Sequence, residues 1–96
     1  MAPWRVLAVQ VLPDFTLHVR FADGTEGRVV MQDFLAADLV GTVFAPLQDP
    51  AFFARAGVEA GVVTWPGEID LAPDTMYREI RQGGCYRMPV WTRKAA

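Results

Sequence analysis

The stretch from Thr64 to Tyr77 constrains the fold more than any other part of this sequence, because most of its residues have a backbone role that can be named. Trp65 supplies an aromatic anchor, and Pro66–Gly67 is typical of a tight turn. Glu68–Leu71 predicts a short partner strand, and Pro73 predicts a helix start, since proline at the first helical position loses no hydrogen bond. The stretch therefore indicates architecture and not catalysis.

The first third of the chain predicts an antiparallel β-meander. Apolar and polar residues alternate over Phe15–Phe21, and this period of two places every second side chain on the core face. Pro13–Asp14 separates this strand from an apolar one at Trp4–Leu12, while the Asp-Gly turn within Ala22–Thr25 leads into a third strand, Glu26–Val30. The residues of the middle strand expected in the core are Phe15, Leu17, Val19 and Phe21.

Three short helices are expected after the meander. The first spans about residues 32–39 and is closed by Gly41. Asp49–Pro50 predicts the second, because the carboxylate can cap free amides and the proline can occupy the first helical position. The third begins at Pro73 and ends at Gly83–Gly84.

These patterns predict an α+β fold, an antiparallel β-meander followed by short helices and further strands. The expected organisation is a single small domain at residues 1–84 and a basic C-terminal tail at residues 85–96. The apolar residues of this tail, Tyr86, Met88, Val90 and Trp91, leave two alternatives open, since the tail can dock as a further strand or remain loose. With 96 residues, of which 52% are apolar, the chain can bury one modest core. No apolar run approaches the roughly 20 residues of a membrane span, and the lone Cys85 fits a reducing compartment. A soluble, cytoplasmic protein without a membrane partner is expected.

Charge is distributed unevenly along the sequence. The net charge is -2, yet residues 78–96 carry five arginines and lysines against Glu79 alone. Such a basic stretch can contact an acidic partner or nucleic acid, or it can be a solvated chain end. The residues predicted to bind a partner are Tyr86, Arg87, Trp91, Arg93 and Lys94.

Candidate chemistry elsewhere is sparse, and we expect no catalytic, cofactor-binding or metal-binding residue. His18 falls on the polar face of its strand without an adjacent nucleophile, which favours a solvated position. Asp70 and Asp74 have two interpretations. They can cap the last helix and complement its dipole, or they can form a cation site together with Tyr77.

Several segments within about residues 6–77 together follow the pattern of a known family. They are Phe21–Gly24, Val43–Leu47, Trp65–Pro66, Ile69–Asp74 and Met76–Tyr77. In this order they resemble the small bacterial domain-of-unknown-function family 2442. The resemblance implies a small α+β domain without enzymatic activity, and for some members a partner in a toxin-antitoxin style gene pair. One departure is Gly67–Glu68, which replaces the commoner Asn-Gly pair of the turn.

Two functional hypotheses follow. The first is a non-enzymatic protein-interaction or regulatory module, an antitoxin-like partner in a two-gene system, that binds a protein or a second copy of itself. The alternative is a transcriptional regulator that contacts nucleic acid through the basic tail. The acidic body of the chain and the absence of a recognition-helix pattern count against this alternative.

Overall fold

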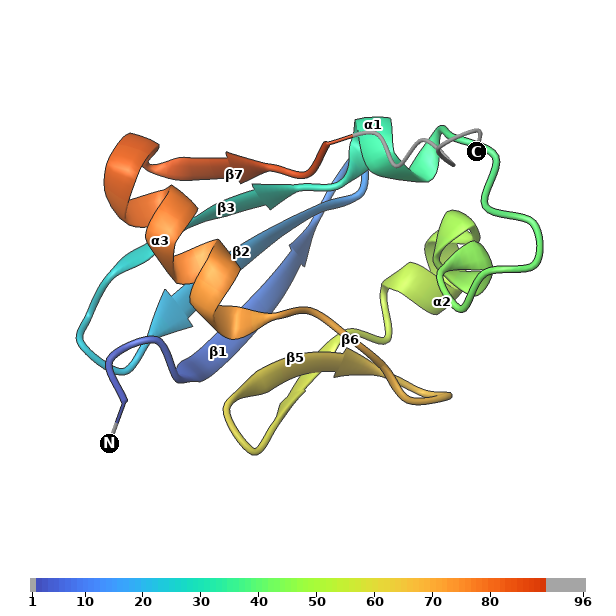
Figure 1. The fold of residues 1–96 in the computed structure, drawn as a ribbon. Helices are drawn as coiled ribbons and strands as arrows, with labels where there is room; N and C mark the ends of the chain where they lie inside the picture. Colours follow the sequence, from blue (N-terminus) through green and yellow to red (C-terminus); the bar gives the residue numbers. More distant parts are fainter. Residues whose placement is uncertain (1, 90–96) are drawn as a thin grey trace, which may run out of the picture.

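The predicted meander forms three antiparallel strands, β1 (Val6–Leu12), β2 (Thr16–Phe21) and β3 (Glu26–Val30). This computed structural model describes residues 2–89. A fourth strand, β7 (Cys85–Arg87), pairs in parallel with β3, so the sheet has the order β1-β2-β3-β7 (Figure 1).

A second antiparallel sheet consists of β4 (Gly57–Glu59), β5 (Val62–Trp65) and β6 (Ile69–Asp70). The turn before β6 has φ of 88° at Gly67 and 64° at Glu68. Positive φ is easy for glycine and uncommon for glutamate. The turn therefore keeps the left-handed conformation that an Asn-Gly pair adopts readily, although glutamate occupies its second position.

The helices are short, and their ends have local causes. Helix α1 (Gln32–Leu35) is followed later by the 3₁₀ helix η1 (Ala45–Gln48) and by α2 (Pro50–Phe53). The predicted cap of α2 is confirmed, since Asp49 Oδ1 accepts from the Ala51 amide at 3.0 Å. The extension of the first helix to residue 39 is wrong.

Carbonyl groups at and just beyond the C-terminal end of helix α1 accept hydrogen bonds from a distant side chain. Gln48 Nε2 donates to the carbonyl oxygens of Leu35 and Ala37, both at 3.0 Å. A carbonyl that accepts from a side chain needs no amide from a further helical turn. Leu39 is still buried, but it reaches the core from the loop that follows the helix.

Helix α3 (Pro73–Gly83) follows its prediction, and Gly84 closes it with a left-handed φ of 78°. Its buried residues Met76 and Ile80 face the four-stranded sheet. The approach is close at Gly27, where an added Cβ would lie 2.6 Å from the Gly84 carbonyl oxygen and 2.7 Å from Ile80 Cγ2. Glycine at this position therefore lets α3 and β7 pack closely against β3.

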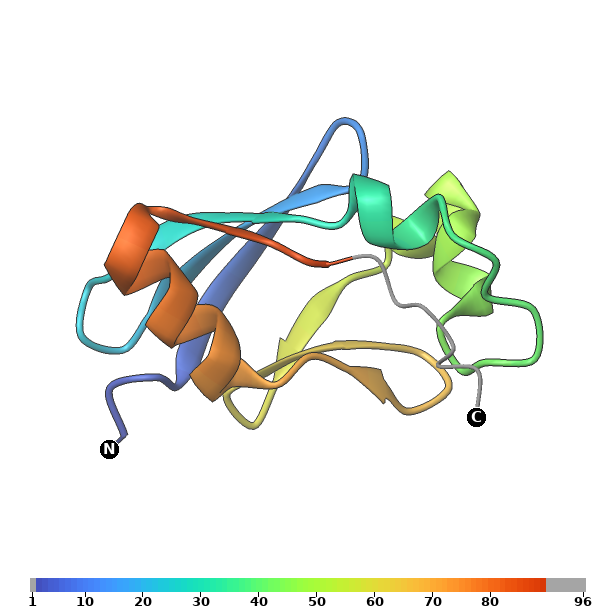
Figure 2. The ribbon, with the colours of Figure 1, turned by 45° about the horizontal axis from the view of Figure 1, so that its top comes forward.

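Helix α3 and the second sheet lie on the same side of the four-stranded sheet (Figure 2). The core lies between the four-stranded sheet and these two elements. The inner faces contribute fully or almost fully buried apolar side chains: Leu17, Val19, Phe21, Val29, Val63, Trp65, Ile69, Met76 and Ile80. The expectation for β2 is confirmed for three of its four residues. Phe15 is only half-buried, because it precedes the strand in a left-handed turn with φ of 54°.

The ordered sheet continues beyond the boundary expected at residue 84. Cys85–Arg87 pairs with β3, and the Met88 amide donates to the Val30 carbonyl at 2.9 Å. These backbone bonds tie the first part of the expected tail to the sheet. None of the helices within residues 2–89 has the length and apolar composition to cross a membrane.

Candidate functional site

Strand β7 separates the predicted partner-binding residues onto two faces. Tyr86 is half-buried and pairs with the buried Val29 on the inner face, whereas Arg87 is exposed and pairs with Val30 on the outer face. Side chains of paired residues lie on the same face of a sheet, and successive residues alternate. Trp91, Arg93 and Lys94 lie outside the described residues.

The outer face of the four-stranded sheet is formed by three rows of side chains that follow from the strand register. Helix α3 and the second sheet cover only the opposite face, so all the residues of these rows are exposed or half-exposed (Figure 2). The first row is Leu12, Thr16, Val30 and Arg87; the second is Gln10, His18, Arg28 and Cys85; the third is Ala8, Arg20 and Glu26.

Positive charge dominates this outer face. Within residues 2–89, Arg20 and Arg28 take part in no ion pair. Arg87 Nη1 lies 3.5 Å from Asp33 Oδ2, with 69% of the arginine side chain exposed. Exposed arginines keep most of their five N–H donors available for carboxylate or phosphate groups.

His18 lies on the outer face as the alternation predicts. Its Nε2 is 3.2 Å from Glu26 Oε1, and 34% of the histidine side chain is exposed. The pair crosses diagonally from β2 to β3, so the carboxylate of Glu26 is directed to the histidine. This contact links β2 to β3 and engages Glu26, the one carboxylate among the residues of the three rows.

The inner side of β7 borders an apolar groove of about 350 Å³. Its lining residues are Phe44, Asp70, Leu71, Ala72, Thr75, Met76, Tyr86 and Met88. Burial raises the pKa of the Tyr86 hydroxyl. The loop that leads to Phe44 exposes two valines, Val40 at 86% and Val43 at 64%. Tyr86 therefore belongs to an apolar environment that is separate from the arginines of the outer face.

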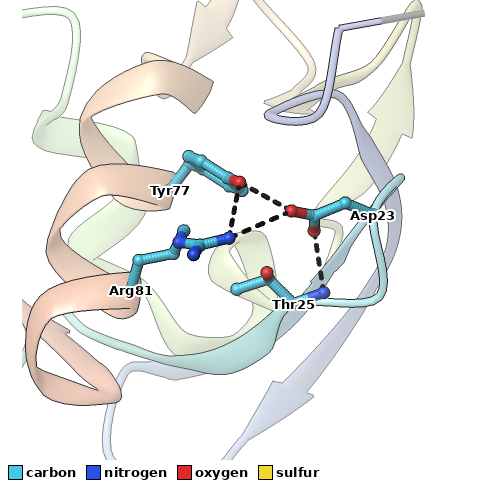
Figure 3. Close-up of polar contacts among 4 residues, drawn as sticks. All are labelled: Asp23, Thr25, Tyr77 and Arg81. Carbon is cyan, nitrogen blue, oxygen red and sulfur yellow. Dashed lines mark hydrogen bonds and ion pairs between the residues drawn. The ribbon is translucent and has the colours of Figure 1, made fainter.

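A polar cluster joins the turn between β2 and β3 to α3 (Figure 3). The Tyr77 hydroxyl donates to Asp23 Oδ2 at 2.6 Å, and Arg81 Nη1 donates to the Tyr77 oxygen at 3.1 Å. Asp23 Oδ1 accepts from the Thr25 amide at 2.9 Å. The Tyr77 ring also packs edge-to-face against Phe21, with 5.3 Å between ring centroids.

The cluster fits a structural role. Hydrogen bonds from Tyr77 and Thr25 lower the pKa of Asp23 to about 2, with a smaller contribution from the charge of Arg81. A carboxylate with so low a pKa is a poor proton acceptor near neutral pH. Sequence reasoning identified Asp23 only as a turn residue, because 54 positions separate it from Tyr77.

The Asp23 cluster has a testable pH dependence. The pKa of Asp23 is depressed in the folded state from an ordinary value of 3.8, so its stabilisation is complete above about pH 4 and disappears as the pH falls through about 2. We expect Asp23→Asn to lower the melting temperature at pH 7 and to approach wild type near pH 2. Asp14→Asn, in the preceding turn, should melt like wild type throughout. A pH-independent difference between Asp23→Asn and wild type would contradict this role.

The structure gives Asp70 and Asp74 neither a joint role as caps of α3 nor a shared cation site with Tyr77. Asp70 is exposed in β6, and the N-cap of α3 is Ala72, without a side-chain cap. Asp74 does lie in the first helical turn and accepts from the Thr75 amide at 3.0 Å. The Tyr77 hydroxyl is bonded to Asp23. Within residues 2–89, no group of three or more potential ligands is positioned to hold a metal ion.

Comparison of the sequence with known protein families identifies one match. No curated protein and no solved structure matches the sequence significantly. A family profile matches residues 6–82, which include the β2–β3 turn, the loop before η1 and the segment from β5 to α3. The chain therefore belongs to the family described as Protein of unknown function (DUF2442).

Proposed function

We propose that this chain is a non-enzymatic protein-binding module whose contact surface is the outer face of the four-stranded sheet. The observation that carries the proposal is the presence of Arg20, Arg28 and Arg87 together on a sheet face that no other element within residues 2–89 covers. A regulatory role in a two-gene system, as the antitoxin-like partner of another small protein, is consistent with this kind of surface.

The composition of the outer face supports a protein partner. Arginine is enriched at protein interfaces, where its planar group binds carboxylates in two-pronged fashion. Two of the arginines lie beside apolar side chains of the same face, since Ala8 pairs with Arg20 and Val30 pairs with Arg87. This mixture gives a partner both apolar area to bury and charged groups that set its orientation.

Nucleic acid is the alternative partner, and the same arginines favour it. Proteins that bind single strands also use aromatic side chains on which bases stack. The outer face carries no phenylalanine, tyrosine or tryptophan among the described residues of β1, β2, β3 and β7, and the ring of its histidine is engaged by Glu26. We therefore propose a protein partner, in the cytoplasm, where an exposed single cysteine such as Cys85 remains reduced.

Charge reversal on the outer face tests the proposal. Wild-type protein should retain a partner from native lysate, and the complex should then reassemble from the two purified proteins. We expect the double variant Arg20→Glu/Arg28→Glu to weaken that purified complex about 100-fold, because two attractive contacts become repulsive. The measurement is a titration by calorimetry.

The matched control reverses two exposed arginines elsewhere. Arg55 lies after α2, and Arg78 lies on α3 with 63% of its side chain exposed. The variant Arg55→Glu/Arg78→Glu has the same net charge as the outer-face variant and should bind the partner like wild type. Equal affinity of the outer-face variant and wild type would reject the outer face as the contact surface.

A further inference from the structure

The outer-face arginines follow one line across the sheet. Arg20 is paired with Glu26, two residues before Arg28 on β3; Arg28 is paired with Cys85, two residues before Arg87 on β7. Each step therefore moves one strand across and two residues along, in the same direction. With strands about 4.8 Å apart and a rise of about 3.3 Å per residue, neighbouring arginines of the line are about 8 Å apart at their Cα atoms.

We infer that the outer face binds an extended acidic segment of the partner protein, with carboxylates at alternate residues. The inference rests on the proposed function and specifies the chemistry of the partner. In an extended chain, side chains two residues apart project from the same side at a spacing of about 6.7 Å. Three such carboxylates match Arg20, Arg28 and Arg87 in order, since the long arginine side chains absorb the remaining difference in spacing.

Charge complementarity selects the acidic segment. The line of arginines crosses the His18–Glu26 pair, whose carboxylate is already directed to the histidine at 3.2 Å. Arg20 and Arg28 have no ion pair to lose among the described residues. An incoming carboxylate therefore does not have to displace an existing partner from these two side chains.

The opposite charge on the second sheet orients the partner. The side of that sheet away from the core carries Glu59 and Asp70, and Glu68 lies in the adjoining turn. An acidic segment is repelled there and attracted to the outer face of the first sheet, which selects one orientation during approach. The apolar side chains of Ala8, which pairs with Arg20, and Val30, which pairs with Arg87, offer contacts to residues between the carboxylates.

Two synthetic peptides of identical composition test the spacing. In one, glutamate alternates with threonine; in the other, glutamates occur in adjacent pairs. We expect the alternating peptide to bind about fivefold more tightly, because all three arginines then meet a carboxylate. Binding is followed by amide chemical shifts in low salt, and the shifts should concentrate on β2, β3 and β7.

Arg28→Gln removes the central charge of the line and should weaken the alternating peptide about fivefold, whereas Arg55→Gln should leave it unchanged. Raising the salt concentration should weaken binding to wild type, because the Debye length shortens from about 10 Å at 0.1 M to about 3 Å at 1 M. Equal affinity for the two peptides would reject the spacing. Tighter binding of a thymidine oligonucleotide than of the alternating peptide would reject the acidic segment in favour of nucleic acid.

The purified partner complex separates failure of this inference from failure of the proposed function. Gln10→Trp places a large side chain on the outer face without changing its charge. If Gln10→Trp disrupts the complex and Arg28→Gln does not, the outer face remains the interface and the acidic segment is rejected. If neither variant affects the complex, the proposed function itself is rejected.

Discussion

Trp65→Ala is expected to lower the free energy of unfolding by about 3 to 5 kcal/mol, a large part of the roughly 5 to 15 kcal/mol available to a small domain. Trp65 is 3% exposed, and its ring lies 5.7 Å from that of Phe53 between centroids. Its Nε1 also donates to the Phe53 carbonyl at 2.8 Å. The substitution therefore leaves a cavity and an unpaired buried carbonyl, which urea denaturation would register.

One further variant separates the contribution of the Trp65 ring from that of its hydrogen bond, and another serves as a control. Trp65→Phe keeps an aromatic ring and removes the N–H donor, so it should cost less, about 1 to 3 kcal/mol. Trp4→Ala removes a tryptophan that is 43% exposed and should change stability by no more than about 0.5 kcal/mol. If Trp65→Ala and Trp4→Ala unfolded at the same urea concentration, Trp65 would not be the anchor that joins α2 to the second sheet.

Leu17→Ala is expected to cost about 2 to 5 kcal/mol. Leu17 is fully buried in β2, where it pairs with Val11 and Val29 on the inner face. Removal of its isobutyl group leaves a cavity that the flanking strands cannot close. The loss should appear as a lower midpoint in chemical denaturation with an unchanged slope.

Thr16→Ala is the matched control on the same strand. Thr16 lies on the outer face, and its hydroxyl donates at 3.3 Å to the Asp14 carbonyl, an exposed contact. This substitution should change the free energy of unfolding by no more than about 0.5 kcal/mol. Equal midpoints for Leu17→Ala and Thr16→Ala would contradict the assignment of the two faces of β2.

The candidate surface was only partly predictable. Tyr86 and Arg87 were identified from composition, yet the structure assigns them to opposite faces of β7. The alternation in β2 already directed Arg20 away from the core. Its alignment with Arg28 and Arg87 could not be predicted, because it depends on the register of two strand pairs, one of which joins segments more than 50 residues apart.

Sequence alone determined the elements whose causes lie within a few residues. The alternation of β2, the Asp49 cap of α2, the Pro73 start of α3 and its end at Gly84 are of this kind. Each depends on side-chain periodicity, on a neighbouring amide or on the φ preference of one residue, and these properties act before any distant contact forms.

Tertiary structure alone decided the features that join distant segments. No local signal predicts the parallel pairing of β7 with β3, the contact of Gln48 with the end of α1, or the link from Asp23 to Tyr77. Each contact forms only when packing of the shared core brings its partners within hydrogen-bonding distance. The free energy that holds them there comes from burying apolar side chains of both sheets and α3, which is a property of the whole chain.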